Sequence, residues 1–381
     1  MKNPLLIEFA ERLMRHPAIA CHEQAVRDEV ETICREHQLR LRRDAFGNVL
    51  VALKTSPRLR PVVLSAHMDH PGFEIVRRFP KTNGRWQARF RGGVPESYFL
   101  TGTRLRLVPG SGRARLGQRI SAPRKAYRID SDTSVPLDPA FAVWDLPAFG
   151  VRNGRIYGRA CDDLIGVAAI LAVMAELRRT RARVNVIGAI TRAEEVGFLG
   201  ALALAAKRTL PKNSLVISLE TSRELPGVTM GQGVILRTGD KASIFNSDAT
   251  RYLAEIAAEL QKKHRAFQFQ RALMSGGTCE ATAYQEFGYQ SAAVCVALGN
   301  YHNCGANDRI ASEYVSINDA ASMVRFLVET VRRLPDYSGL VGRLPKRLGK
   351  LLAEAKNVLP KKRRPVRAGV SATPRPRMIP A

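Results

Sequence analysis

The sequence places histidines and carboxylates next to apolar runs, where they can do metal chemistry. His67 and Asp69 follow one strand-like run, Glu194 and Glu195 follow a second, and Glu220 and His302 follow two more; Asp162 and Asp163 precede an apolar helix. In an open α/β sheet, the carboxyl ends of the strands converge on one crevice. We therefore predict that side chains from five separate parts of the chain meet at one edge of a sheet.

The residue types indicate which metals this edge would hold. Imidazole and carboxylate donors together favour Zn, Co or Mn over Ca or Mg. Five ligands exceed the needs of one ion but satisfy two ions if one carboxylate bridges them: His67, Asp162, Glu195, Glu220 and His302. Two ions about 3.5–4 Å apart can bind an attacking hydroxide and polarise a carbonyl together. The spacing thus predicts a hydrolytic centre with two divalent ions per subunit, zinc fitting best.

The elements that position these residues follow an α/β pattern. Strand-like runs alternate with helical ones, which favours a mostly parallel sheet flanked by helices. The predicted strands are 49–53, 61–67, 183–190, 214–219 and 291–298, and the predicted helices are two within 4–40, then 164–178, 198–207, 250–264, 280–287 and 316–333.

One stretch interrupts this alternation. Between residues 71 and 154, short strand-like runs alternate with turn residues and no long helical segment occurs, a pattern typical of a small β domain. We predict a discontinuous catalytic domain, residues 1–70 and 155–336, with an inserted β domain at 71–154.

Charge sets the last residues apart. The chain carries a net charge of +26, and residues 338–381 contain twelve Lys or Arg against one acid. We expect residues 337–381 to form a solvated, mostly disordered tail. Binding of this tail to a polyanion or to a membrane surface stays open as an alternative.

Cysteine usage and hydropathy bear on the compartment. The six cysteines are scattered without a CxxC pair, which favours a reducing compartment. The N-terminus is an amphipathic stretch rather than a signal peptide. The longest apolar run, 164–177, is shorter than the roughly 20 residues that span a bilayer. We expect a cytoplasmic protein without a membrane segment.

The chain resembles the M42 family of metallo-aminopeptidases, the glutamyl and tetrahedral aminopeptidases within the co-catalytic zinc peptidases. The similarity extends over about residues 4–335. The matching pieces are Ala66-His-Met-Asp69, Cys161-Asp-Asp163 with Gly166, Glu194-Glu-Val-Gly197, Leu219-Glu220-Thr221 and Tyr301-His302, with softer matches at Asp44…Gly47-Asn48, Ser275-Gly-Gly-Thr278 and Ala311-Ser-Glu313.

The resemblance implies a role for each matched residue. Asp162 would bridge two metals, with His67 and Glu220 completing one site and Glu195 and His302 the other. Glu194 would be the general base, and Asp69 would accept the second N–H of His67. Gly276, Gly277 and Thr278 would form either an ordinary flexible turn or a backbone rim for the substrate, and both alternatives stay open. The family's inserted domain implies a homo-oligomer.

The sequence departs from the family pattern beside these positions. Cys279 stands where the family has Asp, Asn303 where Ser or Thr is common, His70 where an acid is usual, and Glu220 replaces an Asp ligand. None removes a metal ligand, so they bear on the substrate pocket. Cys161 and Cys304 neighbour proposed ligands, and thiolate is itself a zinc ligand; we expect both to be packed or supporting residues.

Three functions are therefore weighed. The first is a metal-dependent aminopeptidase that removes N-terminal residues from peptides. The second is a related dinuclear amidohydrolase that acts on acylated amino acids or other small amides with the same ligands. The third is a basic nucleic-acid-binding protein that kept the fold; the intact ligand set argues against it.

Overall fold

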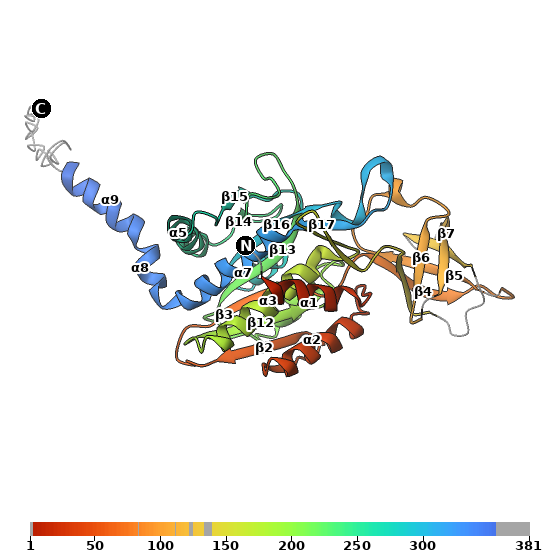
Figure 1. The fold of residues 1–381 in the computed structure, drawn as a ribbon, viewed down its shortest axis with the longest axis horizontal. Helices are drawn as coiled ribbons and strands as arrows, with labels where there is room; N and C mark the ends of the chain where they lie inside the picture. The colour runs from red at the N-terminus through yellow and green to blue at the C-terminus, as the bar shows by residue number, and fades with distance from the viewer. Residues whose placement is uncertain (1–2, 83, 111, 122–124, 133–138, 356–381) are drawn as a thin grey trace, which may run out of the picture. The chain divides into compact units, whose positions relative to one another are not determined.

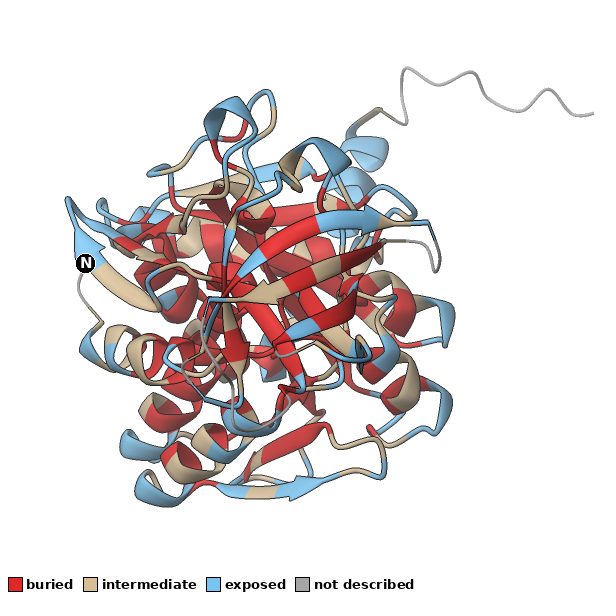
Figure 2. Cartoon of the chain, turned by 90° about the vertical axis from the view of Figure 1, so that its right-hand side faces the viewer, coloured by how far each residue is buried: buried red, intermediate tan, exposed pale blue. Residues whose placement is uncertain are grey.

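The computed structural model describes residues 3–82, 84–110, 112–121, 125–132 and 139–355 (Figure 1). The chain forms two compact units, residues 1–337 and 338–381. The first unit contains every residue for which chemistry is predicted. Within it, buried residues follow the strands and the inner sides of the helices (Figure 2).

One large sheet organises the first unit, in the order β1-β2-β12-β3-β13-β16-β17-β11-β10. The four strands β12, β3, β13 and β16 are parallel, whereas the strands on either side pair antiparallel. β14 and β15 branch from β16. The predicted parallel sheet is confirmed at its centre, and its edges are antiparallel. The bounds are β1 Arg40–Arg43, β2 Val49–Lys54, β12 Asn185–Thr191, β3 Val62–His67, β13 Leu215–Arg223, β16 Gln290–Gly299, β17 Glu313–Ser316, β11 Arg155–Gly158, β10 Phe149–Arg152, β14 Val234–Gly239 and β15 Phe269–Leu273.

The central strands are apolar because helices cover both of their faces. Every residue of β3 and β12 is buried. Ile187 and Ala189 of β12 pack with α4 (Leu199–Ala206) and α6 (Glu280–Glu286). Gly188 between them faces α3 (Cys161–Arg179), where a Cβ would lie 2.6 Å from Ile170 Cγ2. Glycine at this position therefore lets the helix pack closely on the sheet.

Further helices enclose α3, which explains its nearly continuous apolar sequence. α1 (Pro4–Met14) and α7 (Ile317–Arg332) pack against α3, α2 (Gln24–Glu36) packs against α1, and α5 (Ser247–Lys263) packs against α7. A helix that is apolar on all sides is a buried helix. The α/β fold with a helix-flanked sheet, predicted from the alternation, is confirmed.

The inserted segment forms a closed barrel with its own core. Its strands follow the order β4-β5-β8-β7-β6-β9. Large aromatic side chains, among them Trp86, Trp144 and Phe73, fill the interior. The barrel strands extend over residues 72–144, and β10, which lies inside the predicted 71–154 insertion, belongs to the large sheet. The barrel strands are β4 Gly72–Arg78, β5 Arg85–Arg91, β6 Arg104–Val108, β7 Arg113–Ile120, β8 Ala126–Ser131 and β9 Phe141–Trp144.

The start of the basic tail is helical, contrary to the expectation of disorder. α8 (Tyr337–Val341) and α9 (Arg343–Glu354) occupy most of residues 337–355. Leucines at helical spacing in α9 favour this conformation. The rest of the predicted tail, residues 356–381, lies outside the described residues. Along the described part of the chain, no helix combines the length and the apolarity needed to cross a membrane.

Candidate metal centre

A gap between two central strands creates the site. β13 pairs with β3 only as far as Ser218 and then continues beside β16 to Arg223. Glu220 lies in β13 just beyond this divergence, and His67 is the last residue of β3. The prediction that this strand ends at Leu219 is wrong, because β16 goes on supporting β13 after β3 has ended its pairing. The Glu220 side chain therefore enters the space where the strands separate.

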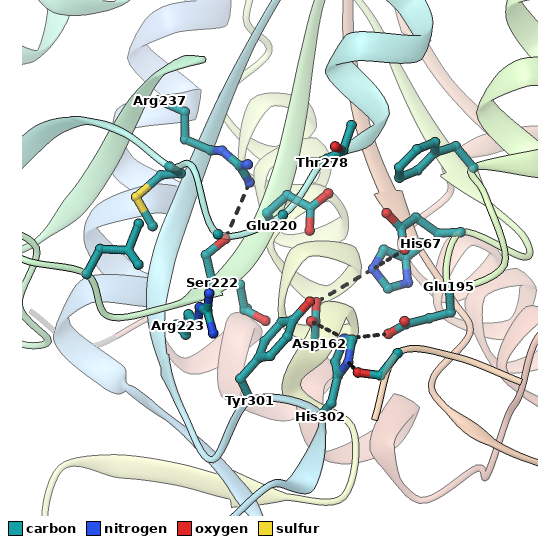
Figure 3. Close-up of a pocket in the computed structure, with 18 of the residues that line it drawn as sticks. His67, Asp162, Glu195, Glu220, Ser222, Arg223, Arg237, Thr278, Tyr301 and His302 are labelled. Atoms are coloured by element: carbon teal, nitrogen blue, oxygen red, sulfur yellow. Dashed lines mark hydrogen bonds and ion pairs between the residues drawn. The ribbon is translucent and has the colours of Figure 1, made fainter. Parts of the chain in front are cut away.

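The five predicted ligands meet in two overlapping groups (Figure 3). His67, Asp162 and Glu220 place one donor atom each within 4.8 Å of one another, and so do Asp162, Glu195 and His302. Asp162 belongs to both groups: its Oδ1 lies 3.6 Å from His67 Nε2 and its Oδ2 lies 3.7 Å from His302 Nε2. The geometry fits two adjacent ions that share one carboxylate.

Both imidazoles are held in the orientation that a metal ligand needs. His67 Nδ1 lies 3.0 Å from the carbonyl oxygen of Asp69, and His302 Nδ1 lies 3.0 Å from that of Gly93. An Nδ1–H that donates to a carbonyl fixes the tautomer and leaves Nε2 as the ligand atom. Gly93 comes from the barrel segment, so the insertion contributes a backbone group to the site.

Unpartnered oxygens provide the test of whether these residues suit a cation. Asp162 Oδ1, Glu195 Oε1 and Glu220 Oε1 are buried without a hydrogen bond among the described residues, and the nearest cationic group to Glu195 Oε1 is the predicted ligand atom His302 Nε2, at 3.1 Å. Buried acceptors are normally paired, since an unpaired one is costly. Divalent ions at these atoms would satisfy all three. The donor set, two imidazole nitrogens and three carboxylates, fits zinc-class ions.

Burial and crowding shift the proton equilibria of the ligands. Burial raises the pKa of Glu220 to about 8, helped by the neighbouring Asp162 carboxylate and opposed by His67. Burial lowers the pKa of His302, but Glu195 and Asp162 outweigh burial and raise it to about 9. Without a bound cation, these carboxylates and imidazoles therefore keep protons at neutral pH. A divalent cation would compete with the protons for the same oxygen and nitrogen atoms.

Glu194 stands beside the ligands without belonging to either group. Its Oε2 lies 3.8 Å from His67 Nε2, and its side chain lines the cavity. Burial, together with the Glu220 and Glu195 carboxylates, raises the pKa of Glu194 well above its usual value although His67 lowers it. A carboxylate with a raised pKa at the edge of a metal site suits proton transfer.

Asp69 contacts His67 through its backbone carbonyl, and its carboxylate has other partners. Its carboxylate accepts the backbone N–H of Glu194 at 2.9 Å and that of Glu195 at 3.1 Å. The carboxylate Oδ1 is 3.6 Å from His67 Nδ1, whereas the carbonyl of Asp69 is 3.0 Å away. Asp69 therefore orients the imidazole through its backbone and the Glu194–Glu195 turn through its side chain.

Two departures from the family pattern contact each other. His70 Nε2 lies 2.9 Å from Asn303 Oδ1, and His70 Nδ1 lies 3.0 Å from the carbonyl of Asp162. The Asn303 amide also donates to the carbonyl of Arg159 at 2.9 Å. This cluster, the His70–Asn303 clamp, joins the segments that carry His67, Asp162 and His302.

Two buried carboxylates to which the sequence analysis gave no role, Asp163 and Glu313, lie behind the ligands. Glu313 Oε2 accepts the Asp162 N–H at 3.0 Å, and Asp163 Oδ1 accepts the Gly166 N–H at 3.1 Å. Gly166 admits this contact, because a Cβ there would lie 2.3 Å from the Asp163 carboxylate. Both residues lie in segments that resemble family motifs. No sequence pattern, however, indicates that Glu313 contacts Asp162, which lies 151 positions earlier.

The cysteines near the centre take no part in either ligand group. Cys161 and Cys304 are absent from both sets among the described residues. Burial, with Glu313 adding to it, raises the pKa of the Cys304 thiol to about 11, and burial also raises that of Cys161. Both therefore favour the neutral thiol over the thiolate that binds metal.

A cavity of about 230 Å³ extends from the metal centre. The predicted rim residues Gly276, Gly277 and Thr278 line it, together with two cations that sequence reasoning did not single out, Arg223 and Arg237. Arg237 is 4% exposed, its Nε has no partner among the described residues, and its Nη1 donates to Ser222 Oγ at 3.3 Å. An almost buried guanidinium beside the cavity is suited to an anionic group.

Comparison with known proteins supports the predicted family. Residues 138–320 match the family model described as M42 glutamyl aminopeptidase. The segment contains Asp162, Glu194, Glu195, Glu220 and His302. The resemblance inferred from the motifs is thereby confirmed.

Individual relatives agree with this assignment. The Escherichia coli (strain K12) protein named "Putative aminopeptidase SgcX" is 22% identical over an alignment of 252 residues; the match covers 58% of this chain and 66% of that protein. The PhTET1-12s structure, a dodecamer in the asymmetric unit, matches with a TM-score of 0.70 at 25% identity. The match covers 85% of this chain and 98% of the PhTET1-12s chain. The TET aminopeptidase of Thaumarchaeota archaeon SCGC AB-539-E09 has a TM-score of 0.73 at 21% identity, with 88% and 99% covered, and shows the same fold.

Proposed function

We propose that this chain, whose residues 138–320 match the model of the M42 peptidase family, is a metal-dependent aminopeptidase that hydrolyses the first peptide bond of peptides. The proposal rests on the two ligand groups that share Asp162, whose central carboxylate oxygens lack a hydrogen bond among the described residues. Two zinc ions fit these donors best, and Co or Mn suit them as alternatives.

The ligand set divides between two positions. His67 and Glu220 would hold one ion, Glu195 and His302 the other, and Asp162 both. When bound, such ions polarise a carbonyl and lower the pKa of water. The hydrogen bonds from His67 and His302 to backbone carbonyls keep each Nε2 directed at its position.

Glu194 supplies proton transfer. It takes a proton from the attacking water and delivers the proton to the leaving amine, and its raised pKa allows both transfers near neutral pH. The Asp69 carboxylate fixes the backbone amides of Glu194 and Glu195. These two side chains thus diverge from one turn, Glu195 toward the ions and Glu194 toward the substrate.

The first experiment combines elemental analysis with hydrolysis of aminoacyl-anilides. The expected result is two metal ions per chain, cleavage of free-amine substrates, and a Glu194→Gln variant that keeps its metal but loses about 10²–10⁴ in kcat. Glu286→Gln, an exposed glutamate on α6, is the matched control. Cleavage of N-acyl amino acids in place of aminoacyl-anilides would favour the amidohydrolase. A protein that binds no metal would refute the proposal.

Assembly and location complete the proposal. The similarity to PhTET1-12s, a dodecamer, supports a homo-oligomer, and light scattering on the purified protein measures its mass. A strictly monomeric mass would contradict it. Six free cysteines support a reducing compartment such as the cytoplasm.

A further inference from the structure

The second compact unit contains an amphipathic helix that the hydrolytic function does not use. Along α9, Leu344, Leu348, Leu351 and Leu352 recur at intervals of three or four residues, while Arg343, Lys346, Arg347 and Lys350 occupy the opposite side. Residues three or four apart share a helix face. One face of α9 is therefore aliphatic and the other cationic.

The aliphatic face is uncovered. Leu348, Leu351 and Leu352 are 53%, 54% and 60% exposed, and no residue of α9 is buried. Single exposed leucines are ordinary, but a row of them along one side marks a surface that binds something. The occupant has to offer apolar contact to this row.

The charge around the row restricts the occupant further. Glu354 is the only acid in residues 338–381, against twelve Lys or Arg. A duplex nucleic acid would neutralise the cations but leave the leucines in water. A second copy would cover the leucines but bring two strongly basic segments together. A bilayer with anionic headgroups offers hydrocarbon to one face and phosphate to the other.

We propose that α9 docks the protein on anionic lipid surfaces. The helix lies in the plane of the interface with its leucines in the acyl boundary and its cations at the phosphates. The further basic residues of 356–381, including the run Lys361-Lys-Arg-Arg364, add an electrostatic component, since each cation near an anionic surface contributes to binding. The proposal concerns surface attachment and is independent of the peptidase assignment.

The test is co-sedimentation of the full chain with vesicles of phosphatidylcholine alone or mixed with phosphatidylglycerol. Binding to the mixed vesicles is expected to exceed binding to neutral ones by at least about tenfold and to fall with salt. Two variants separate the leucines from the charge. The leucine variant, Leu348→Ser/Leu352→Ser, keeps the charge, and the charge variant, Lys346→Gln/Arg347→Gln/Lys350→Gln, keeps the leucines. Each variant should lose most of the binding to the mixed vesicles. Leu100→Ser, an exposed leucine of the barrel segment, is the matched control.

Other outcomes would overturn the proposal. Equal binding to both kinds of vesicle, or full binding by the leucine variant, contradicts it directly. Salt-sensitive binding to a DNA duplex that the leucine variant retains, without vesicle binding, would assign the tail to nucleic acid. If the wild type does not bind vesicles and the leucine variant forms a smaller particle than the wild type in light scattering, α9 mediates contact between copies of the chain. Unchanged peptidase activity and circular dichroism would show that each variant is folded.

Discussion

At the scale of single residues, backbone groups position the side chains of the candidate metal centre. The carbonyls of Asp69 and Gly93 orient the two imidazoles, and the Asp69 carboxylate and Glu313 bind the amides of the ligand segments. A backbone group cannot be replaced by mutation, so these contacts depend on the path of the chain. The side chains that can vary are those that face the substrate or join neighbouring segments.

Arg237 is such a side chain, and we predict that it selects an acidic first residue. Its guanidinium is nearly buried, and among the described residues its Nε has no hydrogen-bond partner while its Nη1 donates to Ser222 Oγ. A substrate carboxylate would provide one, and a hydrogen bond to a charged group contributes about 1.5–3 kcal/mol. Arg237→Met should therefore lower the ratio of kcat/KM for glutamyl-anilide over glutaminyl-anilide by about 10–100-fold.

The comparison of glutamyl with glutaminyl substrates isolates charge, because the two side chains have nearly the same shape. Arg223→Met at the exposed rim of the same cavity is the control and should change the ratio less. If the wild type cleaves both substrates equally well, Arg237 serves the fold and not the substrate.

The His70–Asn303 clamp carries the second residue-level prediction. His70→Leu breaks contacts to Asn303 and to the Asp162 carbonyl, so metal affinity should fall by about 10–100-fold, as for other residues that support metal ligands. Competition with a chelator measures the affinity. Asn303→Leu should resemble His70→Leu, and the double variant should cost less than the sum of both. Strict additivity would show that the contact does not couple the two residues.

At the scale of elements, the β1–β2 turn supports the loop that carries Glu194 and Glu195. Asn48 is fully buried; its amide donates to Asp44 Oδ2 and to the Gly200 carbonyl, and its Oδ1 accepts the Arg192 N–H. Asn48→Ala leaves Gly200 and Arg192 groups unpaired in the interior, and unfolding by denaturant should show a loss of about 3 kcal/mol. Asn213→Ala, exposed on another loop, should change stability by less than about 0.5 kcal/mol. Equal losses in both variants would contradict this role of Asn48.

How far the elements were predictable depends on how local their signals are. His67, Glu194, Glu195 and His302 follow apolar strands, and alternation of strands with helices is a local pattern, so their meeting at one sheet edge followed from the sequence. The continuation of β13 beyond Glu220 was not predictable, because it depends on pairing with β16 some 75 residues later. The same holds for the antiparallel sheet edges.

Contacts between distant segments explain the remaining errors. Gly93 reaches His302 across 209 residues and Glu313 reaches Asp162 across 151, and neither has a motif of its own. The use of the Asp69 carbonyl, in place of its carboxylate, to accept the His67 N–H was not predictable, because backbone amides compete for a carboxylate as well as an imidazole does. α9 differs from the predicted disorder because its leucines recur at helical spacing, whereas the basic composition of residues 337–381 by itself favours disorder.

At the scale of the whole molecule, the barrel is part of the catalytic unit and not an appendage. Besides the Gly93 contact, the Tyr98 hydroxyl donates to the Gly305 carbonyl at 2.9 Å and Ser97 Oγ lies 3.0 Å from Asp308 Oδ1. Both contacts meet the loop that follows His302. The insertion therefore fixes the position of one ligand loop, and ordering of this loop should be coupled to metal binding.

Such coupling predicts that the stability of the first unit depends on metal. Buried oxygens of Asp162, Glu195 and Glu220 lack a hydrogen bond among the described residues, so bound ions would give them partners. A ligand that binds only the folded state stabilises it, by about 2.7 kcal/mol at a free concentration 100 times Kd. Removal of metal with a chelator should lower the thermal midpoint by about 5 °C, and zinc should restore it. Asp162→Asn, which weakens both ligand groups, should show a smaller difference between chelated and zinc-loaded protein. Elemental analysis should first show that the chelator has removed the metal. If the thermal midpoint of the wild-type protein is then the same with and without chelator, the ions do not stabilise these loops.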